Sequence, residues 1–136
     1  MVGVIALGGG LGSLARYATA EALPTGGHGF PWSTFIVNVV GCVLIGVLMV
    51  FVTDVWRPGR YARPFLGIGF LGGLTTYSTM MLDVHTLGAS GDWLLAESYL
   101  AASLALGLVA VWLSMAGTRL LVRAAGRRPD VKEQGT

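Results

Sequence analysis

Four long stretches of apolar residues alternate with short polar connections along this chain. A helix needs about 20 mostly apolar residues to cross a bilayer, and stretches of that length occupy residues 2–22, 32–53, 65–87 and 95–122. The connections contain proline, glycine and aspartate, which end helices and begin turns. The pattern predicts an all-α membrane protein whose four transmembrane helices form one domain, residues 1–124, followed by a polar tail at residues 125–136.

The composition agrees with this prediction. Charged residues make up 12% of the 136 residues, half of the roughly 25% that a soluble domain carries. Hydrophobic residues make up 54%, and the mean hydropathy is +0.69. We therefore expect a surface in contact with membrane lipid, and no nucleic-acid partner. The single cysteine, Cys42, lies within an apolar stretch, so neither a disulfide nor a cysteine-based metal site is expected.

Basic residues are distributed unevenly between the two ends of the predicted helices. With four crossings, both termini and the second connection lie on one side of the membrane. This side carries eight of the nine basic residues, and Arg16 is the exception. Positively charged connections favour the cytoplasm, so we expect a multi-pass protein of the inner (plasma) membrane with both termini and the tail cytoplasmic. The eight residues are Arg57, Arg60, Arg63, Arg119, Arg123, Arg127, Arg128 and Lys132.

The sequence contains no arrangement of residues suited to catalysis. The two histidines, His28 and His85, are far apart and have no metal-ligand spacing to each other or to Cys42. The segment "GLGSLA" at residues 10–15 matches a dinucleotide-binding fingerprint. That fingerprint requires a strand–helix–strand unit, and a long apolar stretch follows instead. We expect a protein that is not an enzyme.

Small residues recur at helical spacing in the apolar stretches. Gly8 and Gly12 are four residues apart in the first stretch, as are Gly69 and Gly73 in the third. This spacing lets helix backbones approach each other closely in lipid. Ordinary helix packing is the preferred interpretation, and the spacing leaves open whether the contacts lie within or between subunits.

Polar side chains within the apolar stretches are candidates for a functional site, because they are costly in lipid unless they are satisfied. Asn38 is the strongest hydrogen-bonding group of the second stretch, and Thr34 lies four residues earlier on the same helical face. Tyr99 and Ser103 likewise share a face of the fourth stretch. For Asn38 two roles stay open: a hydrogen bond between helices, or an N–H donor that faces a pore.

The third stretch contains the segment "GFLGGLTTYSTMMLD", residues 69–83, which combines glycines, five hydroxyl side chains and a carboxylate. Its "GGLTT" portion is made of poor helix formers, which predicts a break in the third helix near mid-membrane. Non-helical backbone is tolerated at that depth only when it packs within protein or lines a wet cavity. Broken helices also expose groups that bind ions. The break is therefore either a packed kink or an ion site, and we favour the ion site.

This segment resembles the third-helix signature of the Fluc (CrcB) family of fluoride channels, which reads G-x-x-G-G-[LF]-[ST]-T-F-S-T-F followed by an acid. "GGGLGSLARY" is similar to the family's first-helix motif, "STFIVNVVGCVLIG" to its second and "SYLAASLALGL" to its fourth, in order over about residues 3–122. The resemblance implies a subunit of a fluoride-selective channel that passively exports fluoride from the cytoplasm and so reduces fluoride toxicity.

The resemblance also implies an assembly. Two subunits would pair antiparallel, as a dual-topology dimer with two fluoride pores. A structural Na⁺ would lie at the dimer centre, on the two-fold axis where the broken helices cross. Its ligands would be the backbone carbonyl oxygens of Gly72 and Thr75 from each subunit, and oxygen ligands suit a hard cation.

The pore residues implied by the resemblance follow from their positions in the motifs. Asn38 would donate a hydrogen bond to fluoride, Asp83 would be the acid near one vestibule, and Arg16 would lie at a pore mouth or subunit contact. The family's two phenylalanines offer ring edges, which carry the positive end of the aromatic quadrupole; Tyr77 and Met80 occupy these positions here. The other polar residues of the path would be Thr34, Ser78, Thr79, Tyr99 and Ser103.

Three of these positions depart from the family pattern. Tyr77 adds a hydroxyl, Met80 lacks a ring, and Asp83 replaces the usual glutamate. Together with the one-sided basic residues, these changes motivate the hypothesis that the partner is a paralogous subunit of opposite topology rather than a second copy. A non-conducting or half-active structural subunit is the alternative function. A small dual-topology drug/proton exporter is less favoured, because it requires a carboxylate inside the first span, which holds Arg16 and, at its end, Glu21.

Overall fold

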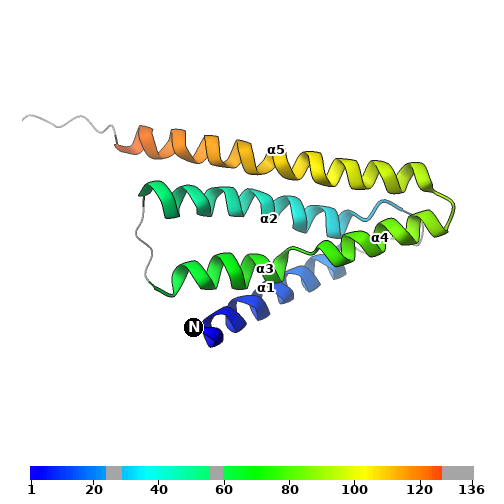
Figure 1. Cartoon of the computed structure of the whole chain (residues 1–136), viewed down its shortest axis with the longest axis horizontal. Coiled ribbons are helices and arrows are strands. Elements are labelled where there is room, and N and C mark those ends of the chain that lie inside the picture. The colour runs from blue at the N-terminus through cyan, green and yellow to red at the C-terminus, as the bar shows by residue number, and fades with distance from the viewer. Residues whose placement is uncertain (24–28, 56–59, 127–136) are drawn as a thin grey trace, which may run out of the picture.

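The computed structural model describes residues 1–23, 29–55 and 60–126, and these residues form helices and contain no strand (Figure 1). The helices are α1 (Val2–Ala22), α2 (Trp32–Val50), the π-helical segments η1 (Phe51–Val55) and η2 (Pro64–Phe70), α3 (Leu71–Leu74), α4 (Tyr77–Ala89) and α5 (Trp93–Gly126). Parts of the first two predicted connections lie outside the described residues. So do the end of the tail and four of the basic residues, Arg57, Arg127, Arg128 and Lys132.

The helices run alternately in opposite directions. In Figure 1, α2 and α5 start at one end of the molecule and run side by side, whereas α1 and the segment from η2 to α4 run the other way. The N-terminus and the C-terminal end of α5 therefore lie at the same end. At this end Arg119 Nε lies 3.0 Å from Asp54 Oδ2, which connects α5 to η1.

Three segments are long and apolar enough to cross a membrane: Trp32–Asp54, Pro64–Ala89 and Trp93–Ala125. The chain is therefore a multi-pass, all-α membrane protein. The first predicted span is also helical, since α1 is 21 residues long, but its glycines, Arg16 and Glu21 make it less apolar than the other three. Helix α5 continues to Gly126, beyond the predicted span end at residue 122, because a helix does not have to stop where the lipid ends.

Helix α1 packs tightly against η2 and α3 through glycines. A Cβ atom added at Gly69 would lie 2.7 Å from the carbonyl oxygen of Ile5, and one at Gly12 would lie 2.8 Å from Leu74 N and collide with the Phe70 carbonyl. Gly8 and Gly73 are equally close to backbone atoms of the facing helix. The predicted close approach at these glycines is therefore confirmed, and it occurs within one chain.

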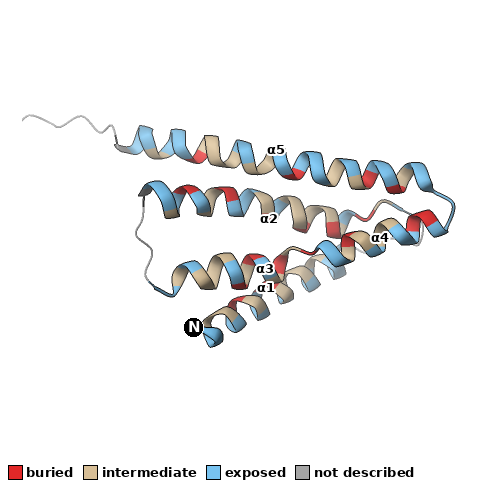
Figure 2. Ribbon diagram, in the orientation of Figure 1, coloured by how far each residue is buried: buried red, intermediate tan, exposed pale blue. Residues whose placement is uncertain are grey.

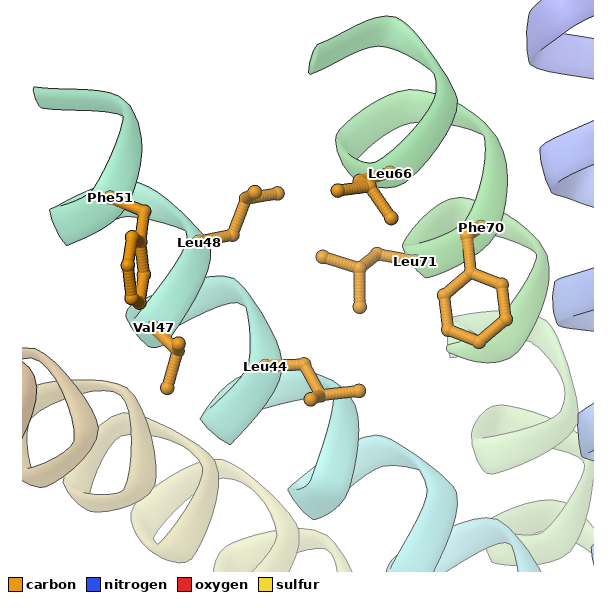
Figure 3. Close-up of a pocket in the computed structure, with 7 residues that line it drawn as sticks. All are labelled: Leu44, Val47, Leu48, Phe51, Leu66, Phe70 and Leu71. Atoms are coloured by element: carbon orange, nitrogen blue, oxygen red, sulfur yellow. The ribbon is translucent and has the colours of Figure 1, made fainter. Parts of the chain in front are cut away.

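Helices α2 and α5 form a second packed pair, beside the pair that α1 forms with the segment from η2 to α3. An apolar groove of about 610 Å³ lies between α2 and that segment (Figure 3). At the other end of the molecule α4 closes the gap, through a buried cluster of Met80, Leu87, Ala96 and Tyr99. The groove is lined from α2 and η1 by Leu44, Val47, Leu48 and Phe51, and from η2 and α3 by Leu66, Phe70 and Leu71.

Many large apolar side chains remain exposed. Figure 2 shows that most of the ribbon is exposed or intermediate, in pale blue and tan. Helix α5 is the clearest case: Leu108 and Trp112 in its middle are 74% and 68% exposed. Contiguous apolar surface of this kind belongs against lipid or another protein surface. The described helices therefore bury only part of the apolar surface that a soluble protein would have to hide from water.

Candidate functional site

The candidate site begins at a break in the third apolar helix. Helix α3 ends at Leu74 and α4 begins at Tyr77, while Thr75 and Thr76 are extended, with ψ angles of 153° and 119°. Figure 1 shows this break as the thin connection between α3 and α4. The break predicted from "GGLTT" is therefore present.

The side-chain amide of Asn38 on α2 supports the broken backbone. Its Nδ2 donates a hydrogen bond to the Thr76 carbonyl at 3.0 Å, and its Oδ1 accepts one from the Thr76 N–H at 2.8 Å. One side chain thus satisfies both polar backbone groups of an extended residue, as a neighbouring strand would. Of the two roles that the sequence left open for Asn38, the structure shows the hydrogen bond between helices. The second Nδ2–H makes no hydrogen bond within the described residues, so the donor role stays a prediction.

Thr76 caps the new helix that follows the break. Its Oγ1 accepts a hydrogen bond from Thr79 N at 3.1 Å, the N-cap contact that supplies an acceptor to a free amide of the first turn. The same hydroxyl donates to Thr79 Oγ1 at 2.9 Å and lies 3.3 Å from Ser78 Oγ. Three hydroxyls are thereby linked at the start of α4.

These contacts free two backbone carbonyls. In an uninterrupted α-helix the amides of Thr76 and Thr79 would donate to the carbonyls of Gly72 and Thr75, four residues earlier. Here the two amides bind Asn38 and the Thr76 side chain instead. Neither carbonyl accepts any of the hydrogen bonds that the described residues form outside their helices. The break therefore offers two unpaired carbonyl oxygens.

A polar groove of about 410 Å³ lies beside the break, where α1, α2 and α4 meet. It brings together four of the predicted residues: Arg16, Thr34, Thr79 and Asp83. Five other polar and small residues line it that the site prediction had not named: Ser13, Tyr17, Ala20, Ser33 and Thr76. Spacing was an available signal for those on α1, because Ser13 is three residues before Arg16, Ala20 is four after it, and Tyr17 is four after Ser13.

Behind the groove, Tyr99 forms a buried polar centre. The residue is 0% exposed, and its hydroxyl donates to Asp83 Oδ2 at 3.2 Å. The hydroxyls of Thr34 and Ser103 lie beside it. Ser103 Oγ is itself buried and has no hydrogen-bond partner among the described residues. Thr34, Tyr99 and Ser103, three of the residues named for the polar path, thus lie together, and Asp83 connects them to the groove.

The other predicted residues do not join this groove. Tyr77 is 70% exposed, and Gly72 and Ser78 are exposed as well. Met80 is 5% exposed and packs in the buried cluster against Tyr99. The two positions that hold phenylalanine in the family signature thus face different surroundings, one open and one buried. The predicted set is not one site within a single chain.

The donor groups near the break limit what could bind there. Among residues 1–23, 29–55 and 60–126 no three His, Cys, Asp or Glu side chains gather in a way that could hold a metal ion. A cation at the break would therefore be bound by carbonyl or hydroxyl oxygens. An anion would find hydroxyl and amide hydrogens, with Arg16 as the positive charge that lines the groove.

Comparison with known proteins gives consistent matches. Residues 3–115 match the family model described as CrcB-like protein, Camphor Resistance (CrcB). A protein of Streptomyces avermitilis named fluoride-specific ion channel FluC 2 is 56% identical over 104 residues, 76% of this chain and 66% of the relative. FluC 1 of Streptomyces coelicolor is 48% identical over 123 residues, 90% of this chain and 80% of the relative. FluC 2 of Nocardia farcinica is 49% identical over the same length, covering 90% and 88%.

Proposed function

This chain belongs to the Fluc/CrcB family, and from that premise we propose that it is a subunit of a fluoride-specific ion channel that lets fluoride leave the cytoplasm. It is a transport protein and not an enzyme. The observation that carries the proposal is the polar groove beside the helix break, set within an otherwise apolar chain. A small anion would exchange its water for the hydroxyls, amide and guanidinium gathered there.

We propose that all four helices cross the inner membrane and that both termini are cytoplasmic. The supporting observation is that the N-terminus and the end of α5 lie at the same end of the molecule (Figure 1). Arg63 precedes η2 at this end, and Arg119 and Arg123 lie in the last turns of α5 there. Basic residues favour the cytoplasmic side, so the three-dimensional arrangement and the charge bias support the same orientation.

The partner that we propose is an antiparallel second subunit. Two surfaces support it: the apolar groove between the two helix pairs (Figure 3), and the exposed residues Gly72, Tyr77 and Ser78 around the break. A second subunit that covered both would bury the apolar surface and bring two breaks together. The one-sided basic residues favour a paralogue of opposite topology over a second copy. Paralogues occur in relatives: Streptomyces avermitilis has proteins named FluC 2 and FluC 3.

A structural Na⁺ is part of the proposed assembly. The residues fit such an ion, because the carbonyls of Gly72 and Thr75 are the two that the Asn38 and Thr76 contacts leave unpaired. Gly72 is also exposed, and a Cβ atom there would meet nothing within 4 Å. When bound, the cation would supply positive charge to the broken backbone. The chain's own contribution is to hold both oxygens free of helical hydrogen bonds.

For the anion, we propose a path from the groove to the exposed face of the break. Arg16 offsets the charge of Asp83, and the hydroxyls of Thr34 and Thr79, which line the groove, replace water as donors. Tyr99 and Ser103 belong to the path from behind the groove, where the Tyr99 hydroxyl donates to Asp83. The remaining members would be Asn38 through its second N–H, Ser78 through its hydroxyl and Tyr77 through its ring edge.

A half-active structural subunit is the second candidate, and one observation favours it. Met80, which has no ring, is buried against Tyr99, so this chain offers the anion one aromatic ring, Tyr77, at the two signature positions. A partner with both phenylalanines would then carry most of the conduction.

Fluoride tolerance of cells tests the proposal. Expression in a bacterium that lacks its own fluoride channel should restore growth in fluoride, either from this chain alone or together with a paralogue from the same genome. The matched control replaces Thr79 by valine, which keeps its shape and removes the hydroxyl. No restoration in either combination, with both proteins present in the membrane, would count against the proposal.

A further inference from the structure

Four aromatic residues gather at the start of α2, next to the buried polar centre. This aromatic cluster consists of Phe30, Trp32, Phe35 and Tyr99. Phe30 contacts the other three, with ring centroids 4.6 Å from Trp32, 5.3 Å from Phe35 and 5.2 Å from Tyr99. No role in the proposed conduction path accounts for Phe30, which lies outside the helices and does not line the groove.

The backbone holds Phe30 in a fixed position. Pro31 follows it as the N-cap residue of α2, with φ −75°, and proline restricts the conformation of the residue before it. The Phe30 carbonyl also accepts a hydrogen bond from Trp32 N at 2.8 Å. The Phe30 ring is therefore attached to a constrained backbone and not to a free connection.

The Phe30 ring meets the Tyr99 ring edge to face, at an interplanar angle of 87°. Such aromatic pairs stabilise a defined geometry beyond simple burial. Tyr99 is 0% exposed; within the buried cluster, Phe30 contacts its ring, and Asp83 Oδ2 accepts a hydrogen bond from its hydroxyl at 3.2 Å. Because a phenol has one proton to donate, the orientation of the ring decides which acceptor receives it.

A competing acceptor lies within reach. Ser103 Oγ is buried beside the Tyr99 hydroxyl and has no hydrogen-bond partner in the described part of the chain. Ser103 can donate to the Tyr99 oxygen or accept from its hydroxyl, so a Tyr99 hydroxyl that was free to turn could donate to Ser103 in place of Asp83. In the structure it donates to Asp83 instead. A charged acceptor favours the bond to Asp83, and packing holds the ring that carries the hydroxyl. Tyr99 lies in the buried cluster with Met80, and Phe30 is the aromatic side chain that contacts its ring.

We propose that Phe30 is a positioning residue for the anion path: it keeps the Tyr99 hydroxyl on Asp83 and thereby holds the carboxylate at the edge of the polar groove. Asp83 lines the groove together with Arg16, so the direction of its negative charge affects any anion that enters. When Tyr99 releases it, the carboxylate turns toward Arg16 and across the groove. This inference rests on the proposed function and adds to it a residue that the family signature does not contain.

The test is a double-mutant cycle on fluoride efflux from liposomes, measured over a range of fluoride concentrations on the assembled channel. Phe30→Leu keeps apolar volume and removes the ring; Tyr99→Phe keeps the ring and removes the hydroxyl. Each should lower efflux by roughly 10-fold, the loss expected for one hydrogen bond to a charged group. Combining them should lower efflux no more than about 2-fold further, because Phe30 acts through the hydroxyl that Tyr99→Phe has already removed.

Two further variants separate positioning from folding. Phe30→Tyr retains the ring and should keep efflux within about 2-fold of the wild type. Phe35→Leu removes a ring from the same aromatic cluster that is not paired with Tyr99, and should also leave efflux nearly unchanged. Efflux losses of Phe30→Leu and Tyr99→Phe that multiply in the double variant, or a Phe35→Leu loss as large as that of Phe30→Leu, would overturn this inference alone. A wild-type channel without fluoride efflux would overturn the proposed function, and this inference with it.

Discussion

Asn38 and Thr76 are 38 residues apart in sequence and form a pair of hydrogen bonds, at 3.0 and 2.8 Å, through which one side-chain amide satisfies both backbone groups of the extended residue. This pairing makes the break in the third helix tolerable inside an apolar layer, where an unpaired backbone group costs several kcal/mol. It also diverts the amide that would otherwise cover the Gly72 carbonyl. One side chain thus links the stability of the break to the oxygen atoms that the break exposes.

Replacing Asn38 by leucine should therefore destabilise the protein. Both polar groups of Thr76 would be left without partners, at about 1–3 kcal/mol each. The check is thermal unfolding in detergent, followed as the loss of a monodisperse peak in size-exclusion chromatography. Val40→Ala is the matched control, because Val40 is on the same helix and 45% exposed. Equal unfolding temperatures for Asn38→Leu and the wild type would contradict the conclusion that the Asn38 side chain stabilises the helix break.

Gly12→Ala should weaken the packing of α1 on α3. The added methyl group would collide with the Phe70 carbonyl, a backbone atom that cannot move aside cheaply. Overpacking of this kind costs about 1–3 kcal/mol, seen as a lower unfolding temperature and a lower yield of folded protein. Gly10→Ala, on the same helix with nothing within 4 Å, should be neutral or slightly stabilising. Equal effects of the two substitutions would mean that α1 does not pack as described.

Met80→Phe restores a ring at the second signature position and should increase fluoride efflux from assemblies of this chain alone. An aromatic contact contributes about 0.5–1.5 kcal/mol, so a 2- to 10-fold rise is expected. Met80→Leu, which alters the side chain without adding a ring, controls for a change in packing. A fall in efflux after Met80→Phe, with the protein still folded, would show that the buried position of Met80 does not become part of the path.

The one-sided basic residues predict a single orientation in the membrane. In a Cys42→Ala background, Thr136→Cys places one thiol at the C-terminus. A membrane-impermeant maleimide added outside spheroplasts should fail to label it and should label it after lysis. Labelling of about half the protein from outside would instead show dual topology, and would remove the charge bias as a reason for expecting a paralogous partner.

The sequence was most informative where a local rule applied. The glycines and β-branched threonines of "GGLTT" predicted the break, and the four-residue spacing of Gly8 with Gly12 and of Gly69 with Gly73 predicted close packing. Both depend on neighbours along the chain, so no knowledge of the fold was required. Arg16, Thr34, Thr79 and Asp83 were named one by one as candidate site residues from the resemblance to the family, and their gathering in one groove was not predicted.

Other features depend on contacts between distant segments and could not be predicted. The pairing of Asn38 with Thr76 requires α2 to pass beside the break, and the sequence alone left the role of Asn38 open. The separate surroundings of Tyr77 and Met80 depend on where α4 resumes after two extended residues. Ser13 and Tyr17 were missed because spacing shows which residues share one side of the first helix, whereas the side that faces α2 and α4 depends on the fold.

The most direct test of the central claim is fluoride efflux from liposomes that contain the purified chain, alone and with its paralogue, recorded with a fluoride electrode and compared with chloride efflux under the same gradient. The account predicts rapid, passive efflux of fluoride while chloride is retained, and loss of that efflux in Thr79→Val. A folded, membrane-inserted assembly that releases no fluoride in either combination, or releases chloride equally fast, would contradict it.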